Sequence, residues 1–220
     1  YRQEEFNFNA DFSRQLTDSV YLSYGLEHRH ETFTLLIGDE NARIGEGPSG
    51  FASPNESNAG AFSRDNLALY LDLEHDLSSQ WLVQYALRHE DYSDFGSTTN
   101  VKVASRYTLT EGFALRGALS TGFHAPTPGQ SNISSTITTF DGQSGIQVEE
   151  GLVPANSSLA RSAGGTELKE EESVNLSFGF TRTLGDNWDL TLDFYRVDVQ
   201  DRIYRTGDIP VPNAEQRTLS

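Results

Sequence analysis

Two histidines and six charged residues are the side chains of this sequence that could bind a metal ion or a ligand. His28 and His30 alternate with Arg29, so on an extended strand both imidazoles lie on one face. Imidazoles at that spacing can bind Zn, Cu or Fe. We favour the simpler interpretation, in which both histidines belong to an exposed polar extension of a strand and hold no metal.

Catalysis is not indicated by the residues that could perform it. A hydrolase needs a nucleophile with a base within reach, and the five histidines and many serines form no Gly-x-Ser-x-Gly elbow. The absence of cysteine removes disulfides, thiolate metal sites and cysteine nucleophiles. The sequence therefore predicts a protein that is not an enzyme and carries no resident cofactor.

Strands must position the charged residues, because the segments around them alternate strictly between apolar and polar residues. Alternation with a period of two indicates β-strands and not helices. Eight segments show it, with these apolar residues in phase: Phe6, Phe8 and Phe12; Val20, Leu22, Tyr24 and Leu26; Leu67, Leu69, Leu71 and Leu73; Trp81, Val83, Tyr85 and Leu87; Val101, Val103 and Tyr107; Phe113, Leu115 and Leu119; Val174, Leu176, Phe178 and Phe180; Trp188, Leu190, Leu192 and Phe194.

The opposite phase of the same segments carries the six charged residues. One uncharged face and one polar face are the pattern of a transmembrane β-barrel, which meets lipid outside and water or a plug inside. A soluble β-sandwich gives the same alternation with its apolar face inward. In a barrel the six residues would face the lumen, pair across strands and in part line a ligand path; they are Asp72, Glu74, Arg88, Arg106, Arg116 and Asp193.

The connections between the segments differ in length between the two ends of the strands. Four are short and polar, around residues 15–18, 77–80, 110–112 and 185–187. At the other strand ends lie two long connections and a shorter one, spanning residues 33–63, 124–166 and 91–97. Short turns at one end and long loops at the other are typical of outer-membrane barrels, with the short turns in the periplasm. A sandwich has no reason for this sorting, so the loops favour the barrel.

Three aromatic residues follow the short turns directly and share the apolar phase: Trp81, Phe113 and Trp188. Aromatic side chains gather at membrane–water interfaces. We therefore expect these three residues in a girdle at the periplasmic boundary. The alternative is that they anchor the core of a sandwich.

Composition agrees with the barrel. The net charge of −16 over 220 residues argues against a nucleic-acid partner. No run approaches the roughly 20 apolar residues of a membrane helix, and the mean hydropathy of −0.51 suits strands that are apolar only at every second position. The chain has no methionine and starts at Tyr1 within a strand, without a signal peptide, so we expect a truncated chain.

The strand count and the turn pattern predict both chain ends on the long-loop side. We expect residues 1–220 to be one incomplete barrel domain with open edges at its first and last strands. The alternatives are a soluble sandwich that binds a ligand such as a carbohydrate, and a small closed outer-membrane barrel with a structural or adhesive role.

Four segments resemble parts of the barrel of TonB-dependent outer-membrane receptors. Each is weak alone, but together they keep the family's order and spacing across about half of the chain. His124 stands where arginine is common in that family, and Glu171 stands near a frequent proline. The segments are Phe95–Val103 through Arg106 and Tyr107; Leu115–Arg116 with Ser120–Pro126; Leu168–Ser173 with Asn175 and Gly179; and Leu190–Val199 with Asp201–Ile203.

The resemblance implies a barrel of about 22 strands with an N-terminal plug, in the outer membrane of a Gram-negative bacterium. Such receptors import a scarce nutrient, namely a ferric siderophore, haem, cobalamin or an oligosaccharide, with energy delivered through TonB. The implied partners are outer-membrane lipid and lipopolysaccharide, the plug, TonB and the small-molecule or metal-chelate ligand. We expect the plug and the TonB-binding segment to lie outside residues 1–220.

Overall fold

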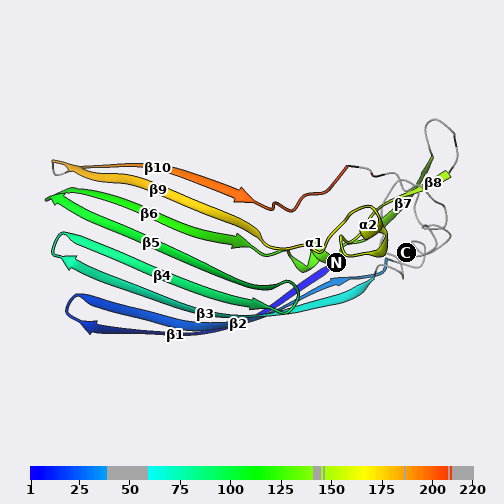
Figure 1. The fold of residues 1–220 in the computed structure, drawn as a ribbon, viewed down its shortest axis with the longest axis horizontal. Coiled ribbons are helices and arrows are strands. Elements are labelled where there is room, and N and C mark those ends of the chain that lie inside the picture. The colour runs from blue at the N-terminus through cyan, green and yellow to red at the C-terminus, as the bar shows by residue number, and fades with distance from the viewer. Residues whose placement is uncertain (39–58, 141–144, 146, 186, 208, 210–220) are drawn as a thin grey trace.

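The eight alternating segments form one antiparallel sheet in the computed structural model (Figure 1). The structure describes residues 1–38, 59–140, 145, 147–185, 187–207 and 209. The sheet has the order β1-β2-β3-β4-β5-β6-β9-β10. Its strands are β1 (Arg2–Thr17), β2 (Val20–Leu35), β3 (Gly60–Ser78), β4 (Trp81–Tyr92), β5 (Gly96–Thr110), β6 (Phe113–His124), β9 (Glu171–Leu184) and β10 (Trp188–Gln200).

This arrangement confirms the predicted eight-stranded antiparallel wall. The sandwich alternative is wrong, because all eight strands lie in a single sheet and not in two packed sheets. The small closed barrel is also wrong, because in the described part of the chain β1 pairs with β2 alone and β10 pairs with β9 alone. The sheet therefore has the two open edges that the sequence predicted.

The strands extend further than the apolar alternation indicates. The predicted 33–63 connection is shorter, because β2 continues to Leu35 and β3 begins at Gly60. The positions of these strand ends that continue the outward phase are mostly polar, and the apolar residues Phe33, Leu35 and Phe62 lie in the opposite phase, so the ladder continues where the outward hydrophobic pattern has stopped. The predicted 124–166 loop contains two short helices, α1 (Pro128–Asn132) and α2 (Ser158–Ser162), and a hairpin of β7 (Ser135–Phe140) and β8 (Gln147–Leu152).

The apolar residues form a band on one face of the sheet and remain largely exposed. The band shifts in register from strand to strand. Leu71, third in its set on β3, lies opposite Leu87, the last of the β4 set, which lies opposite Val101 at the start of the β5 set. This offset is what strand tilt in a barrel produces. A continuous exposed apolar band of this size indicates a surface that meets lipid.

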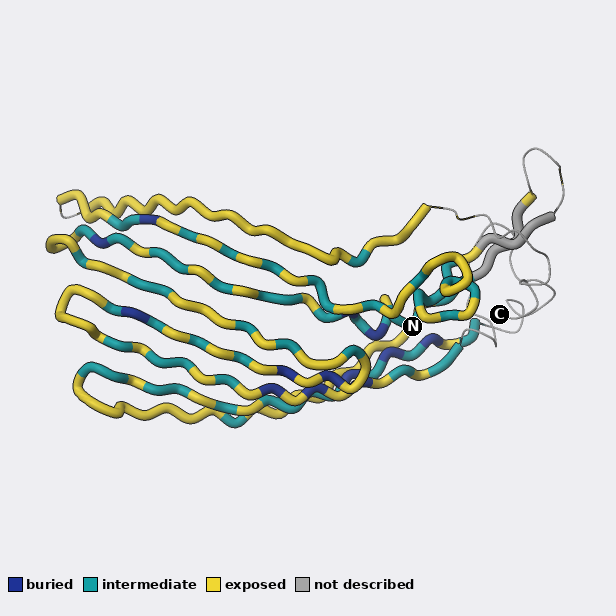
Figure 2. Tube along the Cα trace, viewed as in Figure 1, coloured by how far each residue is buried: buried dark blue, intermediate teal, exposed yellow. Residues whose placement is uncertain are grey.

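Buried residues are concentrated at the loop end of the sheet (Figure 2). A single sheet buries few side chains by itself, and most of the buried ones lie where the β6–β9 connection folds over the strand ends, although Val83 and Ala114 near the short turns are buried as well. Gly129 in α1 packs over the ring of Phe33. Neither described helix has the length and hydropathy that a membrane-spanning helix requires.

Candidate functional site

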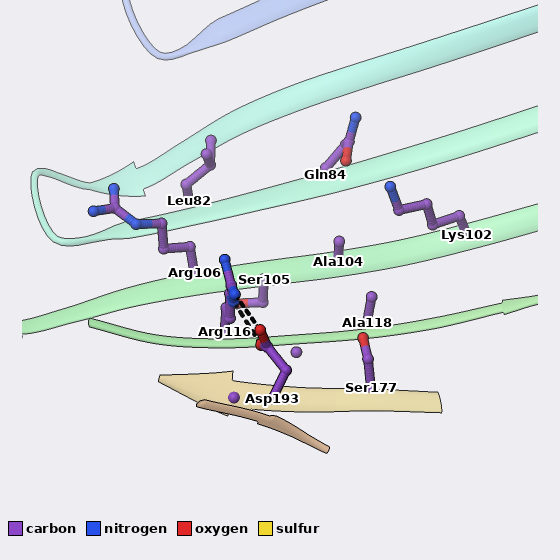
Figure 3. A pocket seen from close by; sticks show the side chains of 12 residues that line it. Leu82, Gln84, Lys102, Ala104, Ser105, Arg106, Arg116, Ala118, Ser177 and Asp193 are labelled. Carbon is purple, nitrogen blue, oxygen red and sulfur yellow. Dashed lines mark hydrogen bonds and ion pairs between the residues drawn. The ribbon is translucent and has the colours of Figure 1, made fainter. Parts of the chain in front are cut away.

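The six charged residues predicted for the lumen all lie on the face opposite the apolar band, but they do not form one site. Arg88 belongs to a cluster at the loop end. Arg106, Arg116 and Asp193 lie together nearer the short turns (Figure 3). Asp72 and Glu74 lie between β2 and β4, where Asp72 accepts a hydrogen bond of 2.8 Å from Gln84 and Glu74 stands opposite Gln84 in register.

Arg88 is the centre of a polar network above the apolar band. Its Nη2 donates to Glu27 at 2.9 Å, and its Nε donates to Glu90 at 2.5 Å. Glu90 is only 4% exposed and also accepts from Asn66 Nδ2 at 3.2 Å and from the Tyr92 hydroxyl at 3.1 Å. Three donors on one buried carboxylate fix its charge and position.

Ionisation in this network follows from burial and from the neighbouring charges. Burial opposes the charge on Glu90, but the hydrogen bond and the charge of Arg88 outweigh it and hold the pKa of Glu90 below its ordinary value. Burial, reinforced by the Glu90 carboxylate, raises the pKa of Tyr92 to about 12. At neutral pH the cluster therefore holds an ionised Glu90 and a protonated Tyr92.

Arg64 ties the β6–β9 connection to the wall. The side chain is 5% exposed and donates through Nε to Glu31 at 2.6 Å and through Nη1 to the Pro126 carbonyl. Its guanidinium also lies 3.7 Å from Asp94 and 5.1 Å from the centroid of the Tyr92 ring. A buried arginine with these partners stabilises the strand ends and the loop as one unit.

Sequence reasoning found Arg88 but missed its partners. The missed residues share the lumen phase of their strands, so continuing the alternation beyond the last apolar residue would have found them. They are Glu27, Arg29 and Glu31 on β2, Arg64 and Asn66 on β3, and Glu90 and Tyr92 on β4. Two of their buried atoms, Arg29 Nε and Asn66 Oδ1, have no hydrogen-bond partner among the described residues.

A pocket of about 410 Å³ lies beside this network, between the strand ends and the loop. Aromatic rings, amides, hydroxyls, two acids and the edge of Arg64 line it, so it can hydrogen-bond a polar ligand and pack against an apolar one. Its lining residues are Phe62, Ser63, Arg64, Asp94, Phe95, Pro128, Ser131, Asn132, Ala155, Asn156, Glu167 and Leu168.

His28 and His30 both contact one oxygen of Asp65. The distances from Asp65 Oδ1 are 3.3 Å to His28 Nε2 and 2.9 Å to His30 Nδ1. Asp65 lies two residues before Leu67, the residue of the apolar band nearest the loop end of β3, and the hydrogen bond with His30 is the main cause of the lowered pKa of Asp65. In the part of the chain that the structure describes, no group of three or more His, Asp or Glu residues could hold a metal ion.

The three aromatic residues predicted for a girdle lie at the short-turn end of the apolar face. The Trp81 indole donates to Ser105 at 2.8 Å. Phe113 packs edge-on against Phe180, with a centroid distance of 6.0 Å. Trp188 is 75% exposed. Their place at the membrane boundary stays a prediction.

The two departures from the receptor pattern contact each other. His124 and Glu171 are register partners on β6 and β9, and His124 Nδ1 lies 4.0 Å from Glu171 Oε2. Glu171 also accepts a hydrogen bond of 2.8 Å from the backbone N–H of Ile203. The pair therefore joins the ends of three neighbouring segments on the loop side of the sheet.

Comparison with known proteins agrees with the fold. The family model for the TonB dependent receptor-like β-barrel matches residues 1–219. A curated relative, the ferric enterobactin receptor PirA of Pseudomonas aeruginosa, is 29% identical over 147 residues, which cover 64% of this chain and 18% of the relative.

Solved structures give the same fold at lower identity. The crystal structure of the siderophore receptor PirA from Pseudomonas aeruginosa superposes with a TM-score of 0.65 at 22% identity, covering 90% of this chain and 32% of that one. A variant of the ferric enterobactin receptor PfeA from the same organism, in complex with enterobactin, gives 0.66 at 19% identity, covering 90% and 27%. The chain thus spans about a third or less of the length of these relatives, and it belongs to the TonB-dependent receptor family as part of an outer-membrane β-barrel wall.

Proposed function

We propose that residues 1–220 form part of the barrel of a receptor that binds a ferric siderophore outside the cell and imports it with energy supplied through TonB. The observation that carries this proposal is the family match along residues 1–219 together with a relative named as a ferric enterobactin receptor. Among the nutrients that the sequence left open, the relatives favour a siderophore over haem, cobalamin or an oligosaccharide.

The loop-end pocket is where we place contact between this part of the wall and the ligand. It opens at the long-loop end of the sheet and combines aromatic walls with amide and hydroxyl groups. These groups suit a chelate that carries aromatic rings and amide or carbonyl oxygens. The plug, TonB, lipid and lipopolysaccharide are the proposed partners of the whole receptor.

The family consists of transport receptors. We propose in addition that the parent protein has no catalytic activity, since the sequence holds no nucleophile with a positioned base. Phospholipid turnover by the purified full-length receptor would contradict this.

Uptake of labelled iron tests the transport proposal. The full-length parent is expressed in a Gram-negative strain that lacks its own catecholate receptors and keeps TonB. We expect saturable accumulation of ⁵⁵Fe-enterobactin that disappears when TonB is removed. Growth rescue by haem, cobalamin or an oligosaccharide, without iron accumulation from siderophores, would overturn the siderophore assignment.

A matched pair of variants tests the pocket. Asn156→Ala removes an amide that lines the pocket, and Asn7→Ala removes an exposed amide on β1 that does not line it. Losing one hydrogen bond should raise the half-saturating ligand concentration roughly three- to tenfold for Asn156→Ala only. Equal uptake curves for both variants would place the ligand contact elsewhere.

A further inference from the structure

The loop-end pocket holds more negative than positive charge. Arg64 is the one basic residue among its described lining residues, and the guanidinium already pairs with Glu31 at 2.6 Å. Asp94 and Glu167 also line the pocket. Asp94 lies 3.7 Å from Arg64, and Glu167 pairs with Arg161 at 2.7 Å. Three carboxylates therefore share two guanidiniums, which leaves an excess of negative charge at the pocket.

Arg64 is not free to bind an anionic ligand. Its side chain is 5% exposed and also donates to the Pro126 carbonyl. Glu31 is 6% exposed, so a ligand that drew Arg64 away would leave this carboxylate buried without its partner. Breaking a buried ion pair in this way is strongly unfavourable. An anion in the pocket would therefore meet the acids without gaining a cation.

The connections at the same end of the sheet are acidic in sequence. Residues 36–59 and 125–170, which join β2 to β3 and β6 to β9, hold nine acidic and three basic residues. The short connection between β4 and β5 contributes Asp94. Charge of one sign around an opening lowers the local concentration of ligands of the same sign and raises that of ligands of the opposite sign. Anionic ligands are thus disfavoured on approach as well as in the pocket.

We propose that Asp94 and Glu167 make the receptor select ferric chelates by charge, so that a neutral or cationic chelate binds more tightly than a trianionic one. Three hydroxamate groups neutralise the charge of ferric iron, whereas three catecholate groups leave the complex trianionic. The amides, hydroxyls and aromatic rings of the pocket can contact either kind of chelate, so the acids decide between them. This inference rests on the proposed siderophore function and names the class of chelate that the pocket favours.

Binding of two ferric chelates to the purified full-length receptor in detergent micelles tests the selection. The probes are ⁵⁵Fe-enterobactin, which is trianionic, and ⁵⁵Fe-ferrioxamine B, a cationic hydroxamate complex. We expect the wild-type receptor to bind ferrioxamine B with the lower dissociation constant.

A variant that combines Asp94→Asn with Glu167→Gln removes both charges and keeps the side chains nearly the same size. At a separation of about one Debye length, it should lower the dissociation constant of ferric enterobactin roughly five- to tenfold and raise that of ferrioxamine B about twofold. Damage to the pocket would instead weaken the binding of both chelates. Raising the ionic strength to about 1 M should abolish both shifts, because the Debye length falls to about 3 Å.

Asp18→Asn combined with Glu111→Gln is the matched control. It makes the same change of charge in two short turns at the other end of the sheet, so both dissociation constants should stay as in the wild type.

The outcomes separate this inference from the proposed function. Equal dissociation constants in the wild type and the pocket variant would overturn charge selection and leave the siderophore function intact. Tighter binding of ferric enterobactin than of ferrioxamine B by the wild type would do the same. If neither chelate binds, the proposed function is overturned and this inference with it.

Discussion

Gly179→Ala is expected to break the Arg116–Asp193 ion pair and to strain the sheet. Arg116 on β6 and Asp193 on β10 both stand opposite Gly179 on β9, so the ion pair crosses over the glycine. A Cβ at position 179 would overlap the Asp193 carboxylate and would lie 2.5 Å from the carbonyl oxygen of Leu192. The carboxylate can rotate away, whereas the carbonyl is part of the β10 backbone and moves only with the strand.

The expected magnitude is set by the steric overlap. Forcing an extra methyl into a closely packed position costs about 1–3 kcal/mol. Loss of the ion pair adds little to this, because its side chains are 45% and 43% exposed and water screens their charges. Gly179→Ala should therefore lower the free energy of unfolding by about 1–3 kcal/mol. In a receptor that already carries Asp193→Ala, Gly179→Ala should lower the free energy of unfolding by less, because the new methyl group then overlaps only the Leu192 carbonyl.

Urea titration of the full-length receptor in lipid vesicles measures these differences through a double-mutant cycle. Gly207→Ala is the control, because a methyl group there meets no atom of the described residues within 4 Å, and the change in the free energy of unfolding should stay within about 0.5 kcal/mol. A Gly179→Ala receptor as stable as the wild type would refute the close approach. An equal cost with and without Asp193 would refute the crossing of the ion pair over the glycine.

Three further predictions concern the loop end and the membrane boundary. Arg64→Met leaves Glu31 buried without its partner, so it should lower the free energy of unfolding by about 3–5 kcal/mol and increase hydrogen exchange in the β6–β9 connection. An unchanged exchange rate in this connection would contradict the anchoring role of Arg64. Because the pKa of Tyr92 is raised from 10.0 to about 12, its contribution to stability should be complete below pH 10 and decline as the pH approaches 12. Tyr92→Phe should remove that decline in urea midpoints. The fluorescence of Trp81 and of Trp188 is obtained as the difference between the wild-type receptor and the Trp81→Phe or Trp188→Phe receptor. Lipids brominated near the headgroup should quench this fluorescence strongly, and lipids brominated at the chain end should quench it little; the reverse order would exclude the girdle.

The residues of the lumen face show which features the sequence could predict and which it could not. Alternation placed Arg88, Arg106, Arg116 and Asp193 on one face, because side chains of a strand point to opposite sides in turn. It could not identify Glu27 and Glu90 as the two partners that neutralise Arg88, because pairing across strands depends on register, which the alternation does not give. The helices and hairpin of the β6–β9 connection were missed because short polar segments carry no hydrophobic period.

The sequence by itself determined the eight strands of the large sheet, their faces, the order of short and long connections and the family. These properties depend on the local period of apolar residues and on the order of the motifs, and both can be read directly from the amino-acid sequence. Only the tertiary structure decided that Arg116 meets Asp193 across Gly179, while Arg106 has no ion-pair partner in the part of the chain that the structure describes. Cross-strand contacts depend on register, and a change of one residue in register would exchange the two faces of a strand.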